Sequence, residues 1–334
     1  MKCHITNIYG FGGVSSHAQN SIAEIARSID FIEMGIFGYA VHTDSDSELQ
    51  RRIDGIIASV QRGDIIVFQS PSWNGKRFDY KLINTIKAYG GRVALLVHDV
   101  PAILNPYTRY TLQECVEIYN LADLLILPSE RMRDRLIEEG LTVTNVMYQQ
   151  MFDYPLAVIY ESQEFKKKIT FTGPPTRFPF VYDWTGKTEI ELYALERDIQ
   201  RELPKNVKHR DYCADSKLVY EMSQGGFGFV WSEGEEFEYS RMNLPYKFNT
   251  YMAAGIPVFV KRGMNIENFV AKNGVGYIVD SCEEADEIIQ NMNEETYRGL
   301  IDNVRRIQYM VTNGMFTKKL LFDVVDRMNN KVNE

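Results

Sequence analysis

The sequence predicts an α/β protein built from two doubly wound parallel sheets in tandem. Short β-branched runs alternate with amphipathic stretches, and parallel strands need the crossover connections that helices supply. The alternation weakens between residues 150 and 168 and then starts again. The chain has 334 residues, more than the roughly 100–200 of a usual domain. Two sheets in sequence account for all three observations.

The first sheet is predicted from five short runs, several of them continuously apolar, as in strands that are buried on both faces. These strands are expected at residues 3–8, 36–41, 64–68, 93–97 and 124–127. Helices are expected where apolar residues recur three and four positions apart. They cover residues 22–29, 49–60, 80–88 and 111–121.

The second sheet follows from the same pattern in the other half of the chain. Strands are expected at residues 169–172, 207–212, 228–231, 257–260 and 276–279. Helices are expected at residues 189–203, 217–222, 247–254, 266–272 and 283–292. A helical tail covers 294–329 and breaks near residues 313–314. The domains should therefore be residues 1–155 and 156–310, with residues 311–334 packing on the first domain or at a subunit contact.

Composition excludes several classes of protein. The 37 basic and 45 acidic residues give a net charge of −8, which argues against a nucleic-acid partner. No apolar run approaches the ~18 residues of a membrane span. The start of the chain lacks the apolar core and cleavage site of a signal peptide, so we expect an unexported protein. The four scattered cysteines have no metal-ligand spacing, which predicts reduced thiols and no metal site.

In open α/β sheets, ligands bind beyond the carboxyl ends of the strands, so candidate residues are sought there. The loop 10–16 resembles a phosphate loop, but Ser15 stands where the third glycine of a dinucleotide fingerprint belongs. One interpretation is a tight turn with a serine cap. The other is a loop that lets a ligand approach the backbone while Ser15 or Ser16 donates to a phosphate.

Two further strand ends carry candidate functional residues. His98 and Asp99 follow the strand at 93–97, where such a pair can orient or deprotonate a hydroxyl. The structural alternative is that Asp99 caps the next segment while His98 bonds to the backbone. Trp73, at another strand end, is a candidate platform on which a sugar ring could stack, although most aromatic residues fill cores and surfaces.

The second half of the chain offers one arginine and one acidic run. Arg177 follows the strand at 169–172, and a guanidinium there can fork onto two oxygens of a diphosphate. The alternative is an ordinary surface arginine. The acidic run 233–238 is more typical of a solvated loop than of a catalytic cluster, and it would repel a diphosphate if it folded inward.

The segment 243–258 carries the strongest signal. Pro245 suits the first turn of a helix, Gly255 its end and Pro257 the start of the next strand. The N–H groups at the helix start, with Lys247 beside them, predict an anion site. The structural alternative is a short buried helix with an exposed lysine.

The run 245–258, followed by residues 274–279, resembles the nucleotide-sugar half of GT-B glycosyltransferases. The resemblance extends over nearly the whole chain. Residues 4–10, 68–74 and 243–258 are most similar to one group of bacterial glucosyltransferases. Members of that group add glucose from UDP-glucose to N-acetylglucosamine already attached to serine-rich repeat adhesins.

This resemblance implies two Rossmann-like domains facing across a cleft, with residues 1–155 on the acceptor side and 156–310 binding the nucleotide sugar. It implies a cytoplasmic, metal-independent enzyme, often a homotetramer, that adds the second sugar of the adhesin glycan. The expected partners are UDP-glucose as donor and the N-acetylglucosamine-modified adhesin as acceptor, with no further cofactor.

The family's donor contacts can be carried over residue by residue. They fall on Ser16, Arg177, Tyr212, Asn243, Leu244, Pro245, Tyr246 and Lys247. Tyr212 would face the uracil. The chain also departs from the pattern, because Met242 and Thr250 stand where many GT-B enzymes have two glutamates, so the usual glutamate contact to ribose is missing.

Three alternative functions stay open at this point. The chain could be a catalytically silent GT-B-like subunit that binds a partner transferase or acts as a chaperone for the adhesin, although Arg177 and Lys247 argue against this. It could use another nucleotide sugar, such as UDP-galactofuranose. A nicotinamide-dependent oxidoreductase is disfavoured by Ser15 and by the lack of a clear ribose-binding acid.

Overall fold

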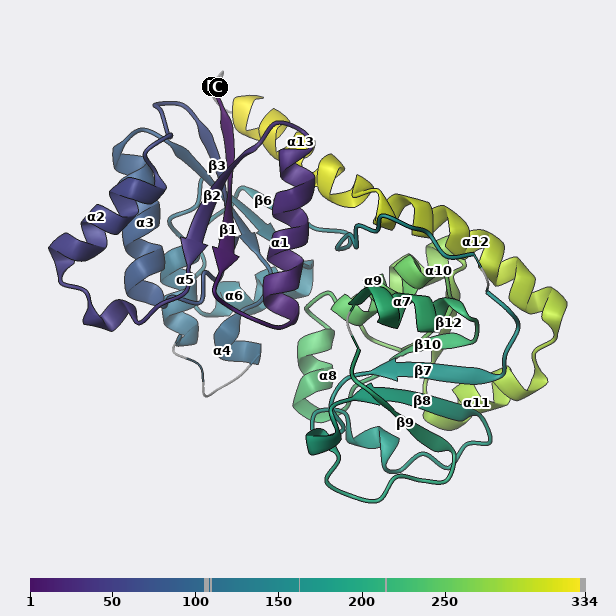
Figure 1. Cartoon of the computed structure of the whole chain (residues 1–334). Coiled ribbons are helices and arrows are strands. Elements are labelled where there is room, and N and C mark those ends of the chain that lie inside the picture. Colours follow the sequence, from purple (N-terminus) through teal and green to yellow (C-terminus); the bar gives the residue numbers. More distant parts are fainter. Residues whose placement is uncertain (105–107, 109, 162, 214, 331–334) are drawn as a thin grey trace. The chain divides into compact units, whose positions relative to one another are not determined.

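The computed structural model describes residues 1–104, 108, 110–161, 163–213 and 215–330 (Figure 1). The chain divides into two compact units, Met1–Phe152 with Gly314–Glu334, and Asp153–Asn313. These boundaries lie within a few residues of the expected ones. Each unit holds one sheet of six strands, all of them parallel. The predicted fold class, with two doubly wound parallel sheets, is confirmed.

The first unit contains a sheet in the order β2-β1-β3-β4-β5-β6. Its strands are β1 (Cys3–Tyr9), β2 (Ile32–Phe37), β3 (Ile65–Ser70), β4 (Arg92–Val97), β5 (Leu124–Leu127) and β6 (Val146–Tyr148). Its helices are α1 (Val14–Arg27), α2 (Asp46–Ile56), α3 (Lys76–Ala88), α4 (Pro101–Leu104), α5 (Leu112–Tyr119), α6 (Glu130–Glu138) and α13 (Met315–Asn330). Helices α1 and α13 pack together on one face of the sheet, and α2 and α3 on the other (Figure 1).

The second strand was predicted at residues 36–41, but it ends at Phe37. Its inward-facing residues are Met34 and Ile36, which are buried as the strand pairs with β1. Val41 is also buried, yet it begins a 3-10 turn instead of continuing the strand. Because Val41 is apolar and buried, the sequence pattern predicted a strand that extends beyond its actual end.

The second unit contains a sheet in the order β12-β11-β10-β7-β8-β9. Its strands are β7 (Lys168–Thr172), β8 (Glu189–Ala194), β9 (Val207–Asp211), β10 (Phe227–Val230), β11 (Val258–Lys261) and β12 (Gly276–Val279). Its helices are α7 (Asp215–Ser223), α8 (Gly234–Ser240), α9 (Tyr246–Ala254), α10 (Glu267–Asn273), α11 (Cys282–Asn291) and α12 (Glu294–Thr312). Helices α7, α9 and α12 pack together over one face (Figure 1).

The predicted helix at residues 189–203 is wrong. The segment begins with strand β8, whose residues Ile190 and Leu192 lie in a core of aromatic side chains. Between them, Glu191 is paired with cations on the neighbouring strands β7 and β9. The alternation was hidden because Tyr193 and the residues after it extend the apolar run. The acidic run 233–238 also differs from its prediction, because most of it forms α8 instead of a loop.

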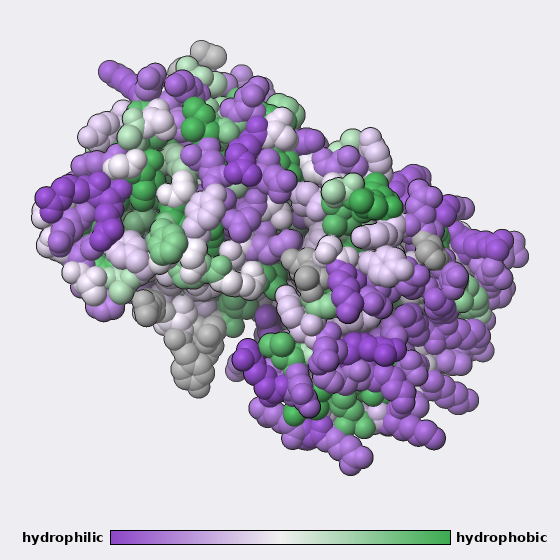
Figure 2. All heavy atoms as spheres, viewed as in Figure 1, coloured by the Kyte–Doolittle hydropathy of each residue, from purple (hydrophilic) through white to green (hydrophobic). Residues whose placement is uncertain are grey.

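The break predicted near residues 313–314 is confirmed, since α12 ends at Thr312 and α13 begins at Met315. Helix α13 is tied to the first unit at its far end, where Arg92 donates to the carbonyl of Met328 at 2.6 Å. Within the described ranges, no helix is both long and apolar enough to cross a membrane. The viewed face of the molecule is mostly hydrophilic, with separate small hydrophobic patches (Figure 2).

Candidate functional site

The amino end of α9 is built as the sequence predicts. Pro245 occupies the position before the first helical residue, and Gly255 ends the helix in a left-handed conformation with φ 77°. Among the described residues, no side chain caps the first turn of this helix. Its amino end therefore presents backbone N–H groups and a partial positive charge, which suit an anion.

Lys247 lies in the first turn of α9 with its ammonium nitrogen buried, although the residue as a whole is half-buried. The nitrogen lies 3.4 Å from the ring centroid of Phe178 and 4.2 Å from that of Phe171. Within the described part of the chain it has no hydrogen-bond partner. Burial lowers the pKa of Lys247 well below its ordinary value, and the charge of Arg177 lowers it further. A buried ammonium held only by rings favours an anionic ligand.

Arg177 lies beside this lysine, in the loop after β7. Its Nε and Nη2 donate to the two carboxylate oxygens of Glu236, at 2.8 and 2.6 Å. Its guanidinium carbon lies 5.4 Å from the centroid of the Phe178 ring. Both cations therefore lie over the same phenylalanine ring, and the charge of Arg177 acts on the pKa of Lys247. The structure brings these two sequence-predicted residues together.

The other donor residues expected from the resemblance lie on the same unit, except Ser16, which belongs to the first unit. Asn243 and Leu244 are buried before α9, and the amide of Asn243 donates to the Tyr239 hydroxyl at 2.9 Å. The Tyr246 ring lies 6.0 Å from that of Tyr154. Tyr212 follows β9, at the edge of the sheet two strands from β7, with 59% of its surface exposed.

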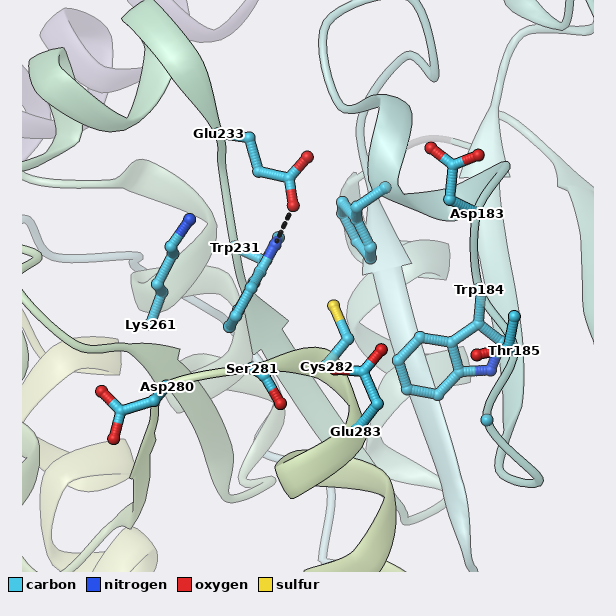
Figure 3. A pocket seen from close by; sticks show the side chains of 12 residues that line it. Asp183, Trp184, Thr185, Trp231, Glu233, Lys261, Asp280, Ser281, Cys282 and Glu283 are labelled. Atoms are coloured by element: carbon cyan, nitrogen blue, oxygen red, sulfur yellow. Dashed lines mark hydrogen bonds between the residues drawn. The ribbon is translucent and has the colours of Figure 1, made fainter.

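A pocket of about 330 Å³ opens beyond the carboxyl ends of β10, β11 and β12 (Figure 3). Its lining residues are Phe180, Asp183, Trp184, Thr185, Gly186, Trp231, Glu233, Lys261, Asp280, Ser281, Cys282 and Glu283. Sequence reasoning did not bring these residues together as a site, although some of them, such as Trp231 and Lys261, lie where predicted strands end. The rule that ligands bind at strand ends could have indicated both.

The charge of this pocket makes it a poor site for a diphosphate. Carboxylates of Asp183, Glu233, Asp280 and Glu283 surround it, against the single ammonium of Lys261 (Figure 3). That ammonium already donates to the Ser232 carbonyl at 3.1 Å and lies 4.8 Å from the Trp231 ring centroid. The cationic pair beside α9 is therefore the better anion site of the second unit.

In the first unit, the geometry defines the protonation of His98. The Gln69 side chain donates to the carbonyls of Thr6 and Gln19, at 2.6 and 3.1 Å, so its oxygen is the accepting atom. His98 must then donate from Nε2 to this oxygen, at 2.8 Å. Its ring stacks on Phe152 and is 3% exposed, and burial lowers its pKa to about 3. His98 is thus a neutral, buried group that orders the strand ends.

Asp99, the other half of the predicted pair, is half-buried directly after β4. Ser15 donates to its carboxylate at 3.4 Å, so the loop 10–16 and the end of β4 meet. Ser16 is buried in the first turn of α1 and accepts from the Asn20 amide at 3.3 Å. Of the two serines, Ser15 is the one that contacts the predicted catalytic pair.

Trp73 lies in the loop after β3, with a left-handed backbone of φ 62°. Asp79, in the first turn of α3, is fully buried and binds this loop through hydrogen bonds. It accepts from the hydroxyl of Ser72 and, at 3.0 Å, from that of Tyr110. Burial raises the pKa of Asp79 to about 7. No sequence pattern indicates this role, because an acid in the first turn of a helix is ordinarily a surface residue.

Comparisons with known proteins place this geometry in a family. The Glucosyltransferase 3-like N-terminal domain matches residues 2–151, and the Glucosyltransferase 3-like C-terminal domain matches residues 169–324. Glucosyltransferase 3 of Streptococcus gordonii is 38% identical over 331 residues, covering 97% of this chain and 98% of that protein. Glucosyltransferase 3 of Streptococcus parasanguinis is 38% identical over 327 residues, with the same coverage.

Among solved structures, Anabaena HepE in complex with UDP-glucose superposes with a TM-score of 0.63 at 13% identity, over 98% of this chain and 100% of HepE. Its complex with UDP gives a TM-score of 0.67 at 12% identity, with the same coverage. This likeness concerns the fold. The two parallel sheets, together with these family matches, identify a GT-B glycosyltransferase. The chain belongs to the Glucosyltransferase 3-like family, as the matches over nearly its whole length show.

Proposed function

We propose that this protein transfers glucose from UDP-glucose to N-acetylglucosamine on a serine-rich repeat adhesin, as the second step of its glycosylation. Membership of the Glucosyltransferase 3-like family supports the sugar and the reaction class. The observation that carries the donor assignment is the buried ammonium of Lys247 beside the guanidinium of Arg177. Two such cations are suited to a diphosphate, and the acidic pocket beyond β10–β12 is not.

The chemical task of this transferase is to stabilise the UDP leaving group as the anomeric bond breaks. Negative charge then grows on the β-phosphate, where preorganised donors are most effective. We assign that role to Arg177, Lys247 and the N–H groups at the start of α9, with Asn243, Leu244, Pro245 and Tyr246 shaping the site. Each charge-assisted hydrogen bond contributes about 1.5–3 kcal/mol. Ser16 and Tyr212 complete the proposed donor contacts, with Tyr212 facing the uracil.

The acceptor is assigned to the strand ends of the first unit, with Trp73 as a sugar platform. Of the pair at the end of β4, Asp99 is the better candidate for contacting an acceptor hydroxyl, because His98 is buried and its pKa of about 3 makes it a weak base. His98 then acts as a positioning residue. The proposal extends to a cytoplasmic homotetramer, on the strength of the family resemblance.

Mass spectrometry of an N-acetylglucosaminyl peptide tests this proposal. After incubation with the protein and UDP-glucose, the peptide should gain the mass of one hexose, and the unglycosylated peptide should gain none. UDP-galactofuranose serves as the competing donor, because the sequence did not separate these two sugars. No transfer from either donor, despite UDP binding, would favour the silent-subunit alternative.

A further inference from the structure

We propose that Glu236 is a built-in counter-ion that occupies the phosphate-binding edge of Arg177 until a nucleotide diphosphate displaces it. This inference rests on the proposed donor site. The guanidinium meets the carboxylate through two parallel hydrogen bonds, at 2.8 and 2.6 Å. A phosphate uses the same forked geometry. The carboxylate therefore stands where two phosphate oxygens would bind.

The surroundings of this pair allow an exchange. The side chain of Arg177 is 47% exposed and that of Glu236 is 20% exposed, so the pair lies at the surface of the unit. Because the pair is only partly buried, water and salt screen part of the attraction between the two charges. Glu236 belongs to the short helix α8, while Arg177 belongs to the loop after β7, and the pair joins the two across 59 residues of chain.

The charge balance gives the exchange its direction. In the free protein, the positive charge of Arg177 lowers the pKa of Lys247, and the negative charge of Glu236 partly opposes this. The negative charge of this one carboxylate thus stabilises the positive charges of both Arg177 and Lys247. A diphosphate brings more negative charge than the carboxylate does, and it repels the carboxylate once both are present. Glu236 should therefore leave Arg177 when the donor binds.

This contact gives the acidic segment before α9 a function. The carboxylate keeps the cationic pair compensated while no donor is present, and it raises the dissociation constant for every diphosphate ligand by the cost of displacement. Donor affinity is consequently set by a residue that makes no contact with the donor in the bound state. Glu235, the adjacent acid on α8, is exposed and offers the same change of charge for a control.

The experiment compares Glu236→Gln with Glu235→Gln by isothermal titration of the full chain with UDP. We expect Glu236→Gln to lower the UDP dissociation constant about fivefold, because binding no longer displaces a charged partner. Glu235→Gln should change it by less than about twofold, since that acid acts only through screened charge. Thermal melting of both variants shows whether they are folded.

An unchanged or higher dissociation constant in Glu236→Gln would overturn the inference, because Glu236 would then be neutral to binding or would position Arg177 for the nucleotide. An equal decrease of the UDP dissociation constant in both variants would also overturn the inference, because the change in net charge alone would then explain it. If the wild-type chain itself fails to bind UDP, the proposed function fails, and the inference with it. If the wild-type chain binds UDP and Glu236→Gln binds it no more tightly, only the inference fails and the proposed function stands.

Discussion

Two basic side chains with buried nitrogens, one in each unit, show how differently a fold can treat such a group. His98 follows β4 and donates to the Gln69 oxygen, with its ring neutral and stacked on Phe152. Lys247 begins α9 and has aromatic rings around its ammonium, with no hydrogen-bond partner in the described part of the chain. The Nε2 of the histidine is thus hydrogen-bonded within its own unit, whereas the hydrogen-bonding capacity of the lysine ammonium stays unused among the described residues. Burial alone therefore does not mark a candidate binding residue, but a buried cation without a hydrogen-bond acceptor does.

The largest expected effect is that of Lys247→Met. Removing the ammonium should weaken UDP binding about tenfold to a hundredfold, measured by isothermal titration. The same variant should raise the melting temperature of the ligand-free protein. The reason is that the pKa of Lys247 is lower in the folded than in the unfolded chain, so protonation favours unfolding.

The sign of this stability effect gives an additional check. The destabilisation by Lys247 is complete below its folded pKa and disappears as the pH rises toward its unfolded value of about 10.5. The stability gained in Lys247→Met should therefore shrink with increasing pH. A variant that keeps the wild-type UDP affinity would remove Lys247 from the donor site and end the contrast with His98.

A second prediction concerns protons taken up on binding. The diphosphate should raise the lowered pKa of Lys247, so UDP binding should draw a proton from the buffer, and affinity should fall as pH rises. Titrations in two buffers of different ionisation enthalpy measure this uptake. Lys247→Met serves as the control, in which the uptake should vanish. Equal uptake in the variant would assign the proton to another group.

His98→Gln tests the other side of the comparison. The pKa of His98 falls from its ordinary 6.5 to about 3 in the folded protein. Between these values the unfolded chain binds a proton that the folded chain does not, so the contribution of neutral His98 is lost as pH falls from 6.5 toward 3. The loss amounts to about 1.4 kcal/mol per pH unit.

Urea unfolding of wild type and His98→Gln at several pH values measures the difference in slope. We expect the variant to be less sensitive to acid in this window, although less stable at pH 7. The pH dependence of kcat should keep its shape, because His98 does not titrate near neutral pH. If a titration near pH 7 disappears from the kcat profile of the variant, His98 is the base and the comparison is wrong.

The smallest expected effect is that of Phe178→Leu. Its ring lies under both cations and replaces part of the water that burial removes from Lys247. Loss of the ring should lower the pKa of Lys247 further and raise the UDP dissociation constant about threefold. Phe180→Leu, in the same aromatic core but without either of these two cations over its ring, is the matched control for lost packing. Equal effects of both would assign the change to packing.

Local sequence signals were sufficient to predict much of the fold. Pro245 and Gly255 predicted the bounds of α9 because each has a backbone preference that needs no partner. The segment at β8 was mispredicted because its strand character depends on pairing with β7 and β9, and a single stretch of sequence does not contain that pairing. The short strand β6 and the helices α4, α6 and α8 were not predicted.

In the candidate site, too, some features follow from the local sequence and others depend on contacts between distant segments. The positions of Arg177 and Lys247 at strand and helix ends followed from the pattern of elements. That the ammonium of Lys247 is buried, and that Arg177 meets Glu236, depends on contacts between segments distant in the chain. The protonation of His98 depends likewise on Gln69, which lies on a different strand.

The return of the last helix to the first unit bears on how the chain is made. Helix α13 covers α1, although the whole second unit is synthesised between them. On a ribosome, the first sheet emerges early and stays without this cover until α13 itself leaves the exit tunnel. A premature stop between α12 and α13 would therefore damage the half of the protein that was translated first.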